Sequence, residues 1–119
     1  MLNRDTFLRI VEKARAAGEK AAKRRYKEII NNPYEQDCGG TFMSIVIEDD
    51  DVKKFFSSLM QDPVEGFDVR GGAKGKYSVS IHDMARYQEV TVCVAAAKAA
   101  LAVFEKELGV KAIIGTYLS

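Results

Sequence analysis

The chain has 119 residues, of which 47% are hydrophobic and 29% charged; this is the composition of a folded domain and excludes an intrinsically disordered chain. The length suits a single domain that buries one core without help from disulfides or metals. The formal net charge of +1 neither supports nor excludes a nucleic-acid partner.

The charge is distributed unevenly along the chain. Residues 1–32 carry nine Lys or Arg against four Asp or Glu, residues 33–68 carry two against nine, and residues 69–119 carry seven against four. Segments of opposite sign can attract one another within one fold or present two different faces to partners.

Nothing in the sequence predicts export or insertion into a membrane. The first residues lead directly into a charged amphipathic segment, without the apolar run of a secretory signal. The longest weakly charged apolar stretch, residues 90–104, contains Lys98 and is too short to span a bilayer. We therefore expect a cytoplasmic protein that makes no membrane contact. In that compartment Cys38 and Cys93 would be reduced. We expect Cys93 to be a small core residue and Cys38 to lie in a loop.

The first predicted element is a long amphipathic helix over residues 5–31, with Asn3 or Asp5 as its cap. Its apolar stripe recurs at steps of three and four residues and is small in the middle: Phe7, Val11, Ala14, Gly18, Ala22 and Ile29. Small residues let another helix approach closely, either from this chain or from a second copy. The opposite face is basic, and its densest part comprises Lys20, Lys23, Arg24, Arg25 and Lys27.

After a turn-rich stretch, the sequence predicts a βαββαβ unit over residues 41–118. Apolar or alternating runs predict its strands and helical periodicity predicts its helices, in the order strand 42–47, helix 49–61, strands 67–70 and 76–81, helix 84–108 and strand 110–117. A glycine-rich hairpin loop over residues 71–75 joins the two middle strands, and Gly109 stops the second helix.

This element order is that of the split βαβ, or ferredoxin-like, arrangement, in which two helices cover one face of a four-stranded antiparallel sheet. We therefore expect an α+β fold in a single domain, residues 1–119, with the N-terminal helix (residues 1–32) ahead of the βαββαβ unit. The second long helix is apolar around most of its circumference between Val90 and Val103. One sheet face cannot cover all of that surface, and the stripe of the N-terminal helix is the available cover.

The most motif-like string lies in the hairpin loop and reads Gly71-Gly72-Ala73-Lys74-Gly75-Lys76. Glycine-rich loops with lysines hold phosphate through backbone N–H groups. This loop lacks the Walker spacing and precedes a strand instead of opening a helix, so we interpret it as a flexible hairpin turn.

The strand after this loop has part of the aromatic signature found in the third strand of an RNA-recognition motif. Lys74, Gly75 and Val79 match the signature. Lys76, Ser78 and Ile81 stand at the positions where the signature has base-stacking aromatic residues. The first strand supplies no exposed aromatic at a secure position. We therefore expect a polar sheet face that is solvated or covered by another element.

A cluster of carboxylates follows the first predicted strand and consists of Glu48, Asp49, Asp50 and Asp51. Clustered carboxylates bind Mg²⁺ and support phosphoryl chemistry. Asp residues at the start of a helix also cap free N–H groups and suit the helix dipole, and the neighbouring hairpin supplies no second carboxylate set. We favour the capping role over a metal site.

His82 is the only histidine and follows the third predicted strand beside Asp83. In a ferredoxin-like topology this point lies near the loop that holds Asp37 and Cys38, so that a Cys38–His82–Asp group is conceivable for nucleophilic catalysis. The alternative, which we favour, is that Asp83 or His82 caps the second long helix.

From Lys76 onward the layout is Lys-Tyr-x-Val-x-Ile, then a long Ala-rich helix, then Leu-Gly-Val-Lys-Ala-Ile-Ile-Gly-Thr-Tyr-Leu over residues 108–118. This layout resembles the tail of small uncharacterised bacteriophage and mobile-element proteins and covers about the last third of the chain. The resemblance carries over no catalytic residues. It implies a small accessory phage protein that works by binding, for instance an inhibitor of a host defence or restriction system.

The sequence thus predicts a non-enzymatic protein, without cofactor, that acts through protein–protein contacts as a homodimer or docked through its long helix. Two alternatives stay open. One is nucleic-acid binding through the basic helix residues Lys20, Lys23, Arg24, Arg25 and Lys27 and the hairpin residues Arg70, Lys74 and Lys76. The other is a metal-dependent nuclease or phosphotransferase built on Glu48, Asp49, Asp50 and Asp51.

Overall fold

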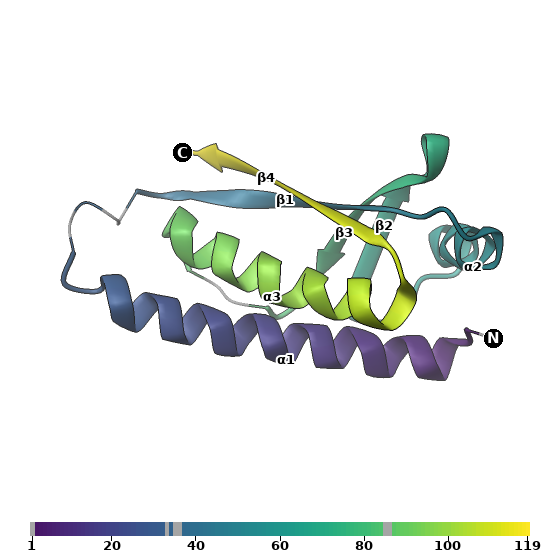
Figure 1. Cartoon of the computed structure of the whole chain (residues 1–119), viewed down its shortest axis with the longest axis horizontal. Coiled ribbons are helices and arrows are strands. Elements are labelled where there is room, and N and C mark those ends of the chain that lie inside the picture. Colours follow the sequence, from purple (N-terminus) through teal and green to yellow (C-terminus); the bar gives the residue numbers. More distant parts are fainter. Residues whose placement is uncertain (1, 33, 35–36, 85–86) are drawn as a thin grey trace.

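A computed structural model describes residues 2–32, 34, 37–84 and 87–119 of the chain. The fold is α+β, as the sequence predicts, and Figure 1 shows the sheet on one side of helix α3 and the long helix α1 along the other. In chain order the elements are α1 (Arg4–Ile29), β1 (Gly39–Val46), α2 (Asp50–Gln61), β2 (Phe67–Gly71), the short 3-10 helix η2 (Ala73–Gly75), β3 (Lys76–Ile81), α3 (Val90–Leu108) and β4 (Lys111–Leu118).

The sheet is antiparallel, and its four strands lie in the order β2-β3-β1-β4. Strand β1 lies between β3 and β4, and its Ile45 faces Tyr77 of β3 on one side and Ala112 of β4 on the other. Side chains alternate between the two faces, so that Tyr77 and Val79 are buried under the helices while Ser78 between them is exposed. One face of the sheet therefore forms the core, and the other carries exposed side chains.

Helix α1 contributes to two hydrophobic clusters. Its first half places Phe7, Ile10, Val11 and Ala14 in the main core with residues of α2, α3 and the sheet. Its second half places Ala22 and Ile29 against Val92 and Ala96 of α3 in a smaller cluster. The apolar stripe of the N-terminal helix thus covers the apolar circumference of α3 within the same chain, which confirms the expected role of that stripe.

The two long helices pack closely against each other at Gly18. A Cβ atom at this position would lie 3.1 Å from the backbone oxygen of Ala96 and would also meet the side chain of Met84. The small centre of the α1 stripe therefore serves close helix packing, as the sequence predicts. Asn3 caps the start of the helix, because its side chain accepts a hydrogen bond from the Thr6 N–H at 2.9 Å.

Helix α3 begins at Val90, so the prediction of a helix from residue 84 is wrong at its start; residues 85–86 of that prediction lie outside the described residues. Residues 88–90 run beside the beginning of β1 instead. Val90 N–H bonds to the Asp37 oxygen and Gly39 N–H to the Gln88 oxygen, both at 2.9 Å. This pairing holds the segment extended, and it removes His82 and Asp83 from the capping position, which Glu89 occupies.

Helix α2 lies at one end of the molecule, across the direction of α1 and α3 (Figure 1). Its Phe55 and Phe56 meet the ring of Phe7 there, with centroid separations of 5.2 and 5.5 Å. The start of α1 is thus a third helical component of the core beside α2 and α3. Within the described part of the chain, no helix combines the length and apolar character needed to cross a membrane.

Candidate functional site

Strand β4 forms one edge of the sheet, and among the described residues only β1 pairs with it. Ser119 N–H bonds to the Cys38 oxygen at 3.1 Å. Because hydrogen-bonding direction alternates along an antiparallel strand, the odd-numbered residues of β4 face β1 and the even-numbered ones face outward. The outward N–H of Ala112 is occupied by Glu105 Oε2 at 3.2 Å. The open part of the edge therefore consists of Ile114, Thr116 and Leu118.

This edge has little protection against pairing with another strand. Lys111 is the single charged residue among the eight of β4, and the strand contains no proline. The opposite edge, β2, is five residues long and carries Asp68 and Arg70. Charged side chains and short length are the usual means of blocking an edge strand, so β4 is the edge that is open to a partner.

Two aromatic side chains stand on the outer face of the sheet beside this edge. Phe42 of β1 is 63% exposed and Tyr117 of β4 is 47% exposed, and their ring centroids are 5.0 Å apart. Gly115 lies directly opposite Phe42 in the strand register. Removing exposed aromatic rings from water is favourable, and a partner that covered this sheet face would do so.

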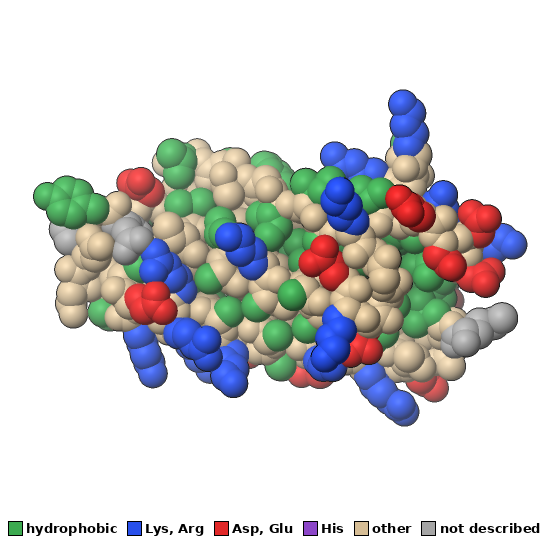
Figure 2. Space-filling view, in the orientation of Figure 1, with side chains coloured by type: hydrophobic (Ala, Val, Ile, Leu, Met, Phe, Trp, Pro, Cys, Tyr) green, Lys and Arg blue, Asp and Glu red, His purple; other side chains and the backbone are tan. Residues whose placement is uncertain are grey.

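A groove of about 540 Å³ lies between the inner side of β4 and the flank of α3. Its lining is mostly apolar and includes Val90, Val94, Thr116 and Leu118, together with two cations, Arg25 of α1 and Lys98 of α3. Figure 2 shows hydrophobic side chains along the band that β4 and α3 occupy, interrupted by a few charged ones. We refer to strand β4, Phe42 and this groove together as the β4 surface.

The basic residues of α1 form a separate surface. Lys20, Lys23, Arg24 and Lys27 line an open hollow of about 520 Å³ with Glu28. Arg25 instead lines the groove beside β4, and it bonds through Nη1 to Glu28 Oε2 at 2.8 Å. These residues occupy the second half of α1, whereas the hairpin between β2 and β3, with Arg70, Lys74 and Lys76, lies at the other end of the molecule (Figure 1). The structure does not bring the two predicted basic groups together.

The glycine-rich hairpin loop bonds to its own backbone. Gly72 N–H donates to the Lys76 oxygen at 2.8 Å and Gly75 N–H to the Gly72 oxygen at 3.1 Å. A Cβ atom on Gly75 would collide with the Ile47 oxygen, which is why glycine stands there. These two amides are engaged in the turn, and β2 and β3 pair antiparallel on either side of it, so the interpretation of the loop as a hairpin turn is confirmed.

The carboxylate cluster lies at the start of α2. Asp49 is the cap, and its Oδ1 accepts a hydrogen bond from the Val52 N–H at 3.0 Å, while Asp50 and Asp51 occupy the first turn. Glu48 precedes them and is exposed. Within the described ranges, no three His, Cys, Asp or Glu side chains are grouped closely enough to hold a metal ion. The capping role that the sequence favours is confirmed for Asp49.

His82 pairs with a residue that no sequence pattern singles out. Its Nε2 lies 2.6 Å from Asp68 Oδ2, and both side chains are about half exposed. Asp68 faces Ser80 across the hairpin, so that it neighbours His82 diagonally on the outer sheet face. Cys38 instead forms an isolated bridge with Glu89. The partner of His82 is thus an aspartate on β2, not the Cys38 loop.

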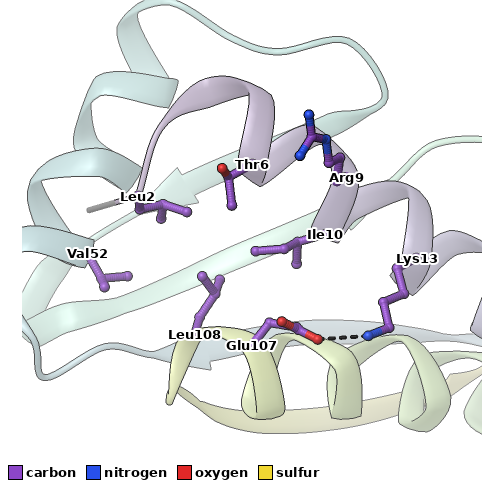
Figure 3. Close-up of a pocket in the computed structure, with 8 residues that line it drawn as sticks. All are labelled: Leu2, Thr6, Arg9, Ile10, Lys13, Val52, Glu107 and Leu108. Atoms are coloured by element: carbon purple, nitrogen blue, oxygen red, sulfur yellow. Dashed lines mark hydrogen bonds and ion pairs between the residues drawn. The ribbon is translucent and has the colours of Figure 1, made fainter.

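An open pocket of about 450 Å³ lies where the first half of α1 approaches α2 and the end of α3 (Figure 3). Its apolar lining comes from Leu2, Ile10, Val52 and Leu108. On one side Lys13 Nζ and Glu107 Oε1 form an ion pair at 2.8 Å, and the hydrogen bond from Lys13 lowers the pKa of Glu107. The two charged groups thus form an ion pair that connects α1 to the end of α3 beside the pocket.

The two cysteines differ in their surroundings. Cys93 lies under the start of β1, with Sγ 3.4 Å from the Tyr87 oxygen, and burial followed by the charge of Glu89 raises the pKa of its thiol. Cys38 is exposed. Because the thiolate is the reactive form, we expect iodoacetamide at near-neutral pH to alkylate Cys38 in the native protein and to leave Cys93 largely unmodified.

Peptide mass spectrometry measures both reactions, and the same protein in urea, where both thiols should react, is the control. Equal rates of alkylation in the native protein would contradict the partial burial of Cys93.

The chain matches no protein-family model, and comparisons with curated proteins and with solved structures found no similar protein. A function can therefore be inferred only from the surfaces of the chain itself.

Proposed function

We propose that this chain is a non-enzymatic binding protein that acts through protein–protein contacts at the β4 surface. The observation that carries the proposal is the edge strand β4, which has eight residues and one charge. Its own Tyr117 and Leu118 are exposed, and so is Phe42 on the neighbouring strand β1. An extended partner segment can add to such an edge through main-chain hydrogen bonds, while neighbouring pockets select its side chains. The groove beside α3 supplies such a pocket.

Two of the residues with catalytic potential have structural partners. Asp49 caps α2, and His82 pairs with Asp68. The thiol of Cys93 is half-buried and its pKa is raised. A binding surface accounts for the exposed apolar side chains, which an enzyme mechanism would leave unexplained.

Two finer assignments belong to the same proposal. We assign the βαββαβ unit to the ferredoxin-like arrangement, supported by the strand order β2-β3-β1-β4 and its antiparallel neighbours. We also assign a phage-type accessory or inhibitor role in the cytoplasm. Its support is the sequence resemblance from Lys76 onward, which includes both α3 and β4, and the free thiols of Cys38 and Cys93.

Replacing Thr116 with proline tests the proposed surface. Proline removes an outward N–H from β4 and leaves the hydrogen bonds to β1 in place, because Thr116 does not face β1. We expect proteins retained by the immobilised chain from a bacterial lysate to be lost from Thr116→Pro and kept by Ser80→Lys, a control on β3 of the same sheet. Retention that is equal for both variants, or absent for the unmodified chain, would count against the proposal.

A second candidate function, binding of single-stranded nucleic acid, is favoured by one observation. Phe42 and Tyr117 form an exposed ring pair on the same sheet face as Arg70, Ser78 and Lys76. Bases stack on such rings while cations contact the phosphates, and each stacked base contributes about 1–3 kcal/mol. Salt-sensitive binding of labelled single-stranded RNA, weakened about tenfold or more by Phe42→Ala, would favour this candidate over the protein-binding proposal.

A further inference from the structure

We propose that the partner at the β4 surface is a second copy of this chain, with the two β4 strands paired antiparallel around a two-fold axis at Thr116. The proposal rests on the protein-binding function proposed above and names its partner. An isologous interface of this kind needs a surface that is complementary to itself. The β4 surface meets this need in its hydrogen-bonding groups, its side chains and its area.

The hydrogen bonds select one register. Only outward-facing residues can bond to the second strand, and Glu105 already occupies the N–H of Ala112. Pairing Thr116 with Thr116 of the second copy, and Ile114 with Leu118, uses the remaining outward groups and leaves the Glu105 contact intact. The register shifted by two residues, with its axis at Gly115, would place Leu118 opposite Ala112 and break that contact.

The outer-face side chains fit the same register. Between the bonded pairs, Gly115 of one copy faces Tyr117 of the other, and Phe42 faces Gly115 from β1. In each copy the Tyr117 ring lies over Gly40 of its own β1, and Gly115 has no side chain, so the outer face leaves room for the second strand to approach. Each Phe42–Tyr117 pair, with centroids 5.0 Å apart, would then stand on the outer face of one continuous eight-stranded sheet.

The inner face offers a matching contact. Thr116 and Leu118 line the groove together with Val94 of α3. Leu118 is 69% exposed in the single chain, and in this register it lies opposite Ile114 of the second copy. Two cations also line the groove in each copy: Arg25 is paired with Glu28, and the stem of Lys98 can lie on apolar surface while its charged end points to solvent.

The area is sufficient for a specific but weak dimer. Strand β4, Phe42 and the flank of α3 amount to about fifteen residues per copy, and standard interfaces bury about 35 Å² per residue. The pair would thus bury on the order of 1,000 Å², the lower limit for specific interfaces. We expect a dissociation constant in the micromolar range and a dimer that depends on concentration.

Cysteine cross-linking tests the register in the full chain. In a background with Cys38→Ser and Cys93→Ala, we expect Thr116→Cys to form a disulfide-linked dimer under mild oxidation, because position 116 faces itself across the axis. Lys54→Cys, exposed on α2 and distant from β4, is the matched control and should give little linked dimer. Gly115→Cys mixed with Tyr117→Cys should cross-link more than either variant alone.

Light scattering over a range of concentrations measures the dimer itself. We expect the unmodified chain to approach twice its monomer mass, Thr116→Pro to stay monomeric, and circular dichroism to show both folded. Should Thr116→Pro not fold, Tyr117→Lys, which introduces two like charges near the axis, replaces it and should also be monomeric.

The contrary outcomes separate the two proposals. A monomeric chain, or Thr116→Cys that cross-links no better than Lys54→Cys, overturns pairing with a second copy. If that monomer still retains another protein and loses it in Thr116→Pro, the protein-binding function stands while the second copy is wrong. A monomer that retains no protein, or that binds single-stranded RNA through Phe42 instead, overturns both.

Discussion

Replacing Phe7 with alanine is expected to lower the free energy of unfolding by about 4 kcal/mol, because the substitution removes a fully enclosed ring and leaves a cavity. Phe7 is 0% exposed. Its ring lies 5.1 Å from that of Phe67 on β2 and 6.3 Å from that of Phe104 on α3, in addition to its contacts with α2. One side chain thus connects α1, α2, α3 and the sheet.

Small domains have a total stability of about 5–15 kcal/mol, so this loss would leave Phe7→Ala marginally folded. Urea unfolding followed by circular dichroism measures the change. The control is Leu8→Ala on the next residue of the same helix, which is 39% exposed and should lose about 1 kcal/mol or less. A loss below about 1 kcal/mol for Phe7→Ala would show that α1 does not enter the core as described.

The second large effect is expected at the crossing of α1 and α3. Gly18→Leu should lower the free energy of unfolding by about 3 kcal/mol or more, because the added side chain meets the backbone of Ala96, which cannot move aside within its helix. Gly18→Ala should change stability by about 1 kcal/mol or less, since its gain in helix propensity offsets a smaller clash with Ala96 and the flexible Met84.

Thermal and urea unfolding of both variants measure these changes. Ala16→Leu, on the exposed side of the same helix two residues earlier, is the control and should lie within about 0.5 kcal/mol of the unmodified chain. If Gly18→Leu were as stable as Ala16→Leu, the close packing of α1 on α3 within one chain would be wrong.

Local patterns in the sequence predict most of the fold. The helical period places Phe7, Ala14 and Gly18 on the buried side of α1, and the period of two separates Tyr77 and Val79 from the exposed Ser78. The start of α3 could not be found in this way. Residues 84–89 have an acceptable helical pattern, but hydrogen bonds to Asp37 and Gly39, far away in the sequence, hold the end of this segment extended.

The candidate site was less predictable because it depends on which strands are neighbours. Phe42 belongs to a mostly apolar run, Phe42-Met43-Ser44-Ile45-Val46-Ile47, in which alternation does not decide which side chains are exposed. That β4 is an edge follows from the strand order, which no single segment encodes. The Asp68–His82 contact follows from the hairpin register, since Asp68 faces Ser80 and His82 lies two residues further on.

The division of α1 between two hydrophobic clusters has a consequence for local stability. Its first half shares the main core with every other layer of the fold, whereas its last turns rest on a small cluster around Ala22, Ile29 and Val92. The free energy of local opening rises with the apolar surface that opening exposes to water, so the two ends of this continuous helix differ in their resistance to fraying. We therefore expect amide hydrogens along this single helix to exchange at graded rates, faster at the basic end than around Phe7.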